Sequence, residues 1–280
     1  MLVGNGGKAS TQERQIATPG ILGGLGPLAH IELEKRILQQ RHQQIEISCD
    51  QDYPTWLMVS ATQIPDRTAS LESREERDRC IEALRHYAQR LQTMGSDFII
   101  IPCNTAHIFY REVQAAIDIP WLHLMDATAD FIRQRYPEAK TVGVLATDGT
   151  IKAGLYAKSL QQVGLIAIEP TCQSLTQKQV MKSIYTPKWG IKTTGTQVSD
   201  RAMRSLSEAA ISLYAQGAEL VIAGCTELSI ACPHLNNLPI PWVDPLQVIA
   251  QSVIAYAYGA YHLPSIHPSH TDETLSYATF

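Results

Sequence analysis

The chain has few of the features that mark membrane, nucleic-acid-binding or secreted proteins. No apolar run approaches the roughly 18 residues that a membrane-spanning helix needs, and the first residues lack the basic and apolar segments of a signal peptide. The net charge is −4 and no block of Lys and Arg occurs, so neither nucleic acid nor an acidic membrane is an expected partner. These absences predict a cytoplasmic protein.

Cysteine is also scarce, with six residues in 280, which is too few for a disulfide scaffold. Four of the six have no repeated counterpart, and we interpret them as buried or incidental thiols: Cys49, Cys80, Cys172 and Cys232. Hydrophobic residues make up 45% of the chain, which is typical of a globular protein with a core, and the length favours two domains. Residues 1–15 and 263–280 are predicted to be flexible tails.

The remaining two cysteines lie in a repeated segment. DFIIIPCNT at 97–105 is echoed by ELVIAGCTE at 219–227, so Cys103 and Cys225 are 122 residues apart (225 − 103). Similar offsets relate two further pairs of segments: GILGGLGP at 20–27 with GVLATDGT at 143–150, and IPWLHLMD at 119–126 with IPWVDPLQ at 240–247. The sequence therefore predicts two homologous halves with a thiol at the same place in each.

Apolar runs alternate with segments of helical length and polarity. The runs at 97–101 and 219–223 are predicted to be parallel strands covered on both faces, while 66–94 and 198–216 are predicted to be helical. This alternation indicates an α/β fold with two similar Rossmann-like domains, parallel sheets and pseudo-twofold symmetry. The first domain is predicted to span 16–128 plus 243–262 and the second 129–242. Because ligands bind beyond the carboxyl ends of parallel strands, we expect the site in the cleft between the domains.

Each repeated cysteine comes directly after a predicted strand and before a segment with helical character. Cys103 precedes NTAHIFYREVQ and Cys225 precedes TELSI, so both sulfurs are expected near helix N-termini, where a thiolate is stabilised. Two such thiols across one cleft allow disulfide exchange, metal binding, or proton transfer on a substrate between them.

The first two chemistries fit the sequence less well. Redox thiols usually share one short C-x-x-C segment. A metal site could use His107, four residues after Cys103, but Ser229 occupies the equivalent place in the second half. The glycine turn at 23–27 loosely matches a dinucleotide motif, but no Asp or Glu follows the next strand to bind a ribose. We expect no metal.

Proton transfer fits best, because paired thiols would present an acid and a base to opposite faces of one carbon. A thiol with an ordinary pKa of about 8.5 can serve in either role near neutrality. Inversion of a stereocentre requires this arrangement.

Five motifs resemble the aspartate racemase branch of the cofactor-independent aspartate/glutamate racemase superfamily. The resemblance spans roughly 16–258 and is carried by GGLGPLA at 23–29, IPDRT at 64–68, CNTAH at 103–107, IK at 191–192 and GCTE at 224–227. It implies racemisation of aspartate without pyridoxal phosphate or another cofactor, with Cys103 and Cys225 as the acid/base pair. It also implies a homodimer.

The same resemblance implies substrate-binding roles. Asn104, Thr105 and Thr226, joined by Thr147, would hold the α-carboxylate and the amino group of the substrate. The side-chain carboxylate would bind Arg67 and Lys192. Taken alone, Arg67 could equally be a helix-terminal residue paired with a nearby acid, and Lys192 a solvated loop charge.

Alternative functions remain open. Glutamate racemases typically carry His after the second Cys-Thr, where this chain has Glu227. A broad-specificity racemase of the same superfamily is also possible, as is a non-catalytic protein that binds acidic amino acids, although binding alone would require neither thiol.

Overall fold

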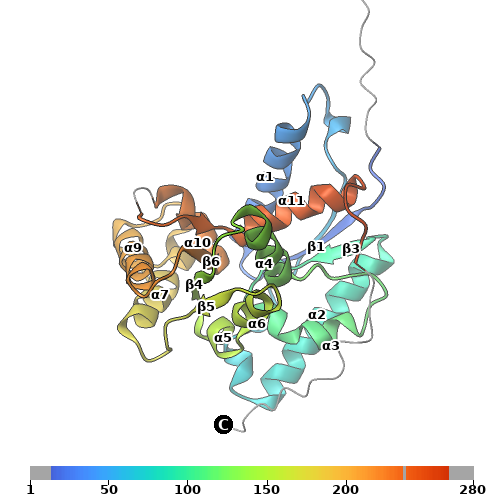
Figure 1. Cartoon of the computed structure of the whole chain (residues 1–280). Coiled ribbons are helices and arrows are strands. Elements are labelled where there is room, and N and C mark those ends of the chain that lie inside the picture. Colours follow the sequence, from blue (N-terminus) through green and yellow to red (C-terminus); the bar gives the residue numbers. More distant parts are fainter. Residues whose placement is uncertain (1–13, 236–237, 265–280) are drawn as a thin grey trace, which may run out of the picture.

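The computed structural model describes residues 14–235 and 238–264, and it shows an α/β protein with two parallel sheets (Figure 1). The first sheet has the order β2-β1-β3 and is formed by β1 (Pro19–Gly23), β2 (Leu57–Ser60) and β3 (Phe98–Ile100). The second has the order β5-β4-β6-β7 and is formed by β4 (Thr141–Ala146), β5 (Ile166–Ile168), β6 (Leu220–Gly224) and β7 (Trp242–Val243). The predicted fold class is confirmed.

Helices connect the strands of each sheet. Those of the first half are α1 (Pro27–Gln44), α2 (Arg74–Thr93) and α3 (Tyr110–Gln114). The others are α4 (Leu124–Arg135), α5 (Asp148–Lys152), α6 (Leu155–Gln162), α7 (Leu175–Tyr185), α8 (Ile191–Thr194), α9 (Asp200–Ala215), α10 (Thr226–Ala231) and α11 (Pro245–Ala257). Four short 3₁₀ segments are also present: η1 (Asp50–Asp52), η2 (Ala69–Leu71), η3 (Thr105–Phe109) and η4 (Cys232–His234).

The strand register reproduces the repeat seen in the sequence. Gly20 of β1 pairs with Ile99 of β3, and Gly143 of β4 pairs with Val221 of β6. The backbone N–H of Ile99 donates to Pro120 and that of Val221 donates to Pro241, at 2.9 Å in both cases. Residues at matching offsets therefore occupy matching places in the two sheets, as two homologous halves require.

The repeated glycines end equivalent helices. Gly95 follows α2 with φ +100° and Gly217 follows α9 with φ +98°. A residue with a Cβ is strained at such angles, and glycine is the usual residue where a helix ends in this conformation. Each glycine turns the chain directly into the strand that leads to a cysteine.

The two halves share a hydrophobic core. One cluster of buried side chains includes Ile21 and Phe98 from the first half together with Val144 and Ile222 from the second. Helix α4 lies centrally in Figure 1 and packs against both α11 and α6. The halves are therefore docked through apolar contacts. The domain boundaries stay a prediction, and the predicted tails, 1–15 and 263–280, lie almost wholly outside the described residues.

Two predicted helices differ from the structure in detail. The segment 66–94 is α-helical only from Arg74. Asp66 accepts from the backbone N–H groups of Thr68 and Ala69 in the turn that leads into η2, and Ser73 then caps α2. The predicted helix over 104–114 begins instead as η3 and becomes α-helical only in α3. The imidazole of His107 explains the second difference, as described below.

No helix of the described part of the chain is long and apolar enough to cross a membrane.

Candidate active site

Both repeated cysteines lie where the sequence predicts, beyond the carboxyl ends of central strands. Cys103 follows β3 after two residues, and Cys225 follows β6 directly as the N-cap of α10. Both residues are buried, each with 6% of its surface exposed.

The two thiols are close to the same ammonium and the same phenol. Burial lowers the pKa of Lys192, but the carboxylate of Glu227 and then both thiols offset this, and the pKa is raised overall. Burial raises the pKa of Tyr185 strongly, and both thiols add to the rise. Lys192 and Tyr185 come from the second half, so Cys103 of the first half faces the second half across the site.

Arg67 is a cation that interacts with Cys103. Its Nη1 donates to the carbonyl of Pro65 at 3.0 Å and its Nη2 to the carbonyl of Leu25 at 3.1 Å. Burial lowers the pKa of Arg67, but charge on Cys103 and Asp66 and a hydrogen bond with Cys103 more than offset this. Nε has no partner among the described residues. The carbonyls fix the fork without neutralising its charge, so the guanidinium can attract an anion.

His107 holds the Cys103 turn in place. Its Nδ1 donates to the carbonyl of Cys103 at 3.0 Å, and its Nε2 accepts from the backbone N–H of Leu124 at 3.2 Å. Both ring nitrogens are therefore used, in the neutral tautomer. Burial, with a contribution from His123, lowers the pKa of His107 to about 3.

The same imidazole accounts for the 3₁₀ turn after Cys103. In an α-helix the carbonyl of Cys103 would accept from the backbone N–H of His107, whereas here it accepts from Ala106 at 3.2 Å and from the His107 ring. His107 thus has the positioning role that is commoner for such a residue than metal binding. The described residues contain no group of three or more His, Cys, Asp or Glu that could hold a metal ion.

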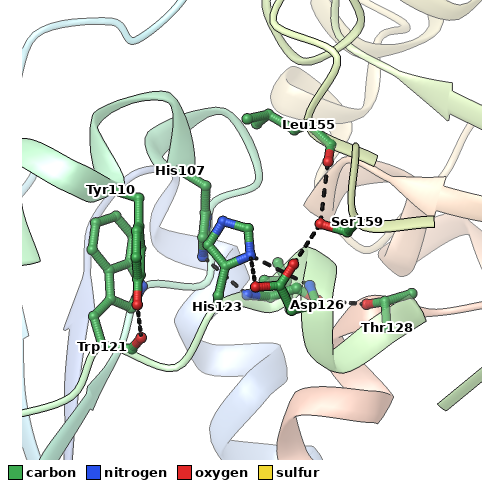
Figure 2. Close-up of polar contacts among 9 residues, drawn as sticks. His107, Tyr110, Trp121, His123, Asp126, Thr128, Leu155 and Ser159 are labelled. Carbon is green, nitrogen blue, oxygen red and sulfur yellow. Dashed lines mark hydrogen bonds and ion pairs between the residues drawn. The ribbon is translucent and has the colours of Figure 1, made fainter. Parts of the chain in front are cut away.

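A second polar cluster lies beside His107 and joins the halves. His123 and Asp126 form a contact of 3.0 Å between Nδ1 and Oδ2, and Ser159 of α6 donates to the other carboxylate oxygen at 2.6 Å (Figure 2). Asp126 belongs to α4, so this bond fixes α4 against α6.

Asn104 presents an unused donor next to Cys103. It is 3% exposed, and its Oδ1 accepts from the hydroxyl of Tyr156, a fully buried residue of α6. Its Nδ2 has no hydrogen-bond partner within the described ranges. An unpaired buried donor is costly, so Nδ2 of Asn104 is a candidate for binding a ligand that carries an acceptor.

Thr105 and Thr147, both predicted to bind substrate, instead contact each other. Their hydroxyl oxygens are 3.0 Å apart, and Thr150 completes a triangle at 3.2 Å from Thr105 and 3.1 Å from Thr147. Three hydroxyl protons serve three contacts, so none is left over for a ligand unless one contact breaks. The triangle joins the Cys103 turn to the first turn of the second half.

The surroundings of Cys225 contradict one prediction. Its thiol donates to Oε2 of Glu227 at 2.8 Å. Burial and the charge of Glu227 raise the pKa of Cys225 well above its ordinary value, although Lys192 opposes the rise. The sequence predicted a helix N-terminus that stabilises thiolate. The prediction was wrong for Cys225 because burial and then an adjacent carboxylate outweigh the start of a six-residue helix.

Lys192 is also placed differently from a solvated loop charge. It lies in α8, and its Nζ is 2.6 Å from Oε1 of Glu227. Thr226 donates to Oε2 of the same carboxylate at 3.3 Å. Glu227 therefore connects Cys225, Thr226 and Lys192, and two of the predicted substrate-binding residues have a partner within the protein.

Sequence reasoning missed four residues of the site: Glu227, Thr150, Tyr156 and Tyr185. Glu227 could have been found, since the repeat aligns it with Thr105, which was already a candidate. Tyr156 and Tyr185 carry no local signal.

Comparison with known proteins agrees with this geometry. The profile described as Asp/Glu/Hydantoin racemase matches residues 22–253. The protein of Bacillus subtilis called "Broad specificity amino-acid racemase RacX" is 29% identical over 244 residues, which cover 86% of this chain and 98% of that protein.

Solved structures show the same fold at lower identity. The aspartate racemase of Picrophilus torridus has a TM-score of 0.67 at 24% identity, covering 86% of this chain and 94% of that one. An aspartate racemase homologue from Pyrococcus horikoshii also has a TM-score of 0.67, at 22% identity, covering 86% and 99%.

Proposed function

Because the chain belongs to the Asp/Glu/hydantoin racemase family, we propose that it interconverts L-aspartate and D-aspartate by a two-base mechanism that needs no pyridoxal phosphate. One observation carries the proposal: equivalent thiols follow strands β3 and β6 of two docked halves, beyond the carboxyl ends of both parallel sheets. Membership of the family itself supports an amino-acid racemase with a small-molecule substrate.

The proposed reaction moves one proton in and one proton out. A thiolate on one side removes the Cα proton and becomes a thiol, while the electron pair of the C–H bond stays on the substrate as a carbanion conjugated with the carboxylate. The thiol on the other side donates its proton to the opposite face of that carbon and becomes a thiolate. The roles exchange for the other enantiomer.

Charge that develops on the substrate needs fixed donors, because no pyridoxal ring is available to delocalise it. Asn104 supports this role, since its buried Nδ2 lacks a partner in the described part of the chain. We assign the α-carboxylate and amino group to Asn104, Thr105, Thr147 and Thr226, of which the three threonines would exchange a present contact for one with the substrate.

The side-chain carboxylate is assigned to Arg67 and Lys192. Arg67 offers a planar fork whose charge is not neutralised by its carbonyl partners. Lys192 would have to share its ammonium between the substrate and Glu227. Arg67 is therefore expected to contribute more than Lys192 to the recognition of an acidic side chain.

The ion pair of Lys192 with Glu227 also favours a second candidate, a broad-specificity racemase. An internal carboxylate already lies beside Lys192, which reduces the positive charge available to an acidic side chain. The relative from Bacillus subtilis that matches most of this chain carries a broad-specificity name. Neutral amino acids are the substrates that would distinguish this candidate.

A panel of L-amino acids tests both candidates. We expect D-aspartate to form, as detected by chiral chromatography, with L-alanine and L-glutamate as comparison substrates. Turnover of alanine at a similar kcat/KM would favour the broad-specificity enzyme. Absence of any racemisation, with binding of aspartate retained in calorimetry, would favour a non-catalytic binding protein and would refute the proposal.

A homodimer in the cytoplasm, with no nucleic-acid or membrane partner, remains our proposal for the protein's assembly and surroundings.

A further inference from the structure

Glu227 has contacts that the racemase reaction itself does not require. Its carboxylate accepts the thiol proton of Cys225 on one oxygen, at 2.8 Å, and pairs with Lys192 on the other, at 2.6 Å. The side chain of Glu227 is 9% exposed, so water screens these contacts little.

The equivalent place in the first half is chemically different. The repeat aligns Glu227 with Thr105, a neutral hydroxyl residue that contacts Thr147 and Thr150 rather than the neighbouring cysteine. Cys103 has the guanidinium of Arg67 close to it. One thiol thus has an anion as its immediate neighbour and the other a cation.

We propose that Glu227 is a positioning residue that holds the proton on Cys225 in the resting protein, so that Cys225 starts as the acid. This inference rests on the proposed racemase function. The hydrogen bond orients the S–H, and the carboxylate opposes ionisation of the sulfur because two adjacent buried anions repel each other.

The other ionisable groups that face Cys225 are consistent with this role. Lys192 of α8 favours thiolate and opposes Glu227. Tyr185 of α7 and Tyr156 of α6 also sense the charge of Cys225, and burial raises the pKa of both phenols far enough to keep them neutral. Apart from burial, the pKa of Cys225 therefore depends on one carboxylate, that of Glu227, and one ammonium, that of Lys192.

The difference between the two thiols can affect kcat and KM for the two enantiomers, but it cannot change the equilibrium between them. Enantiomers have equal free energies, so kcat/KM must be the same in both directions whatever the enzyme does. A resting form with the proton on Cys225 can still make kcat and KM differ individually between L- and D-substrate, because each turnover leaves the proton on the opposite sulfur.

Titration of the Cys225 thiol tests the proposal without any substrate. The rate of alkylation by iodoacetamide is measured against pH by mass spectrometry of the Cys225 peptide, since thiolate is the reacting form. In the wild type we expect a midpoint above the ordinary thiol value of about 8.5. Glu227→Gln should lower the midpoint by about one unit or more, which means roughly tenfold faster labelling at fixed pH. Lys192→Met should raise it.

The opposite signs separate an electrostatic role from structural damage, which would shift both variants in the same direction. Thr105→Val changes the equivalent residue of the first half and should leave the Cys225 midpoint unchanged. If Glu227→Gln does not fold, the upward shift in Lys192→Met still tests the charge balance. An unchanged midpoint in Glu227→Gln, or shifts of one sign in both variants, would overturn the proposal. Failure of the racemase function would appear separately, as wild-type protein that titrates as expected but does not racemise amino acids.

Discussion

The first half of the protein places Arg67 beside its cysteine, whereas the second half places Glu227 and Lys192 beside its own. The backbones match closely, down to the register of the strands and the angles of Gly95 and Gly217. The difference lies in side chains that follow the strands. A repeated fold can therefore place two like thiols at equivalent positions while giving them neighbours of opposite charge.

The largest expected effect comes from removing either sulfur, which tests whether both are needed. Cys103→Ala and Cys225→Ala should each lower kcat for racemisation by about 10³-fold or more, because proton transfer by a positioned group contributes about 10² to 10⁴. Cys49→Ala, which changes an exposed thiol, should remain within about twofold of wild type. Chiral chromatography of initial rates measures all three. A fully active Cys225→Ala protein would rule out the two-base assignment.

The next largest effect concerns aspartate recognition, in which Arg67 and Lys192 are expected to contribute unequally. Arg67→Ala should lower kcat/KM for aspartate by about 10- to 100-fold, since a hydrogen bond to a charged group contributes about 1.5–3 kcal/mol. Lys192→Met should cost less in aspartate recognition, because Glu227 already engages that ammonium. Arg67→Lys serves as the control that keeps the charge and loses the fork. A greater loss in Lys192→Met than in Arg67→Ala would show that the ranking of the two cations is wrong.

A smaller effect concerns His107, which the second half replaces with Ser229. The pKa of His107 is lowered to about 3 in the folded protein, so it stays neutral where the unfolded chain, with a pKa near 6.5, is protonated. Its contribution to stability is therefore complete above about pH 6.5 and is lost as the pH falls toward 3, with a slope of at most about 1.4 kcal/mol per pH unit.

Urea unfolding at several pH values measures this slope, with His107→Gln as the matched variant. We expect the difference in free energy of unfolding between the wild type and His107→Gln to shrink as the pH is lowered from 7 to 4. A difference that stays constant over this range would mean that His107 does not titrate as its burial implies.

The strands and the positions of the cysteines were predictable because both depend on short segments that occur twice in the sequence. Buried parallel strands read as continuous apolar runs, and the turn that follows each run fixes where Cys103 and Cys225 lie. Thr105 and Thr147 became candidates through the family resemblance rather than through the repeat.

The protonation of Cys225 was not predictable because it depends on contacts between distant segments. Glu227 meets Lys192 from α8, and Asn104 meets Tyr156 from α6. Contacts between residues so far apart in the chain produce no pattern of spacing that the sequence alone could reveal. The turn after Cys103 was predicted as an α-helix for a related reason, since the competing bond comes from the side chain of His107 and not from the backbone pattern.

Early-time isotope incorporation in D₂O tests most directly whether two sulfurs act from opposite sides of one substrate. L-aspartate is incubated with the protein, and the reaction is stopped within the first few per cent of conversion. The two enantiomers are then separated, and the deuterium content of each is measured by mass spectrometry. We predict that the D-aspartate formed carries one deuterium at Cα while the recovered L-aspartate carries none. Deuterium in the recovered L-aspartate at the same rate as in the product would mean that one base serves both faces, which contradicts the account.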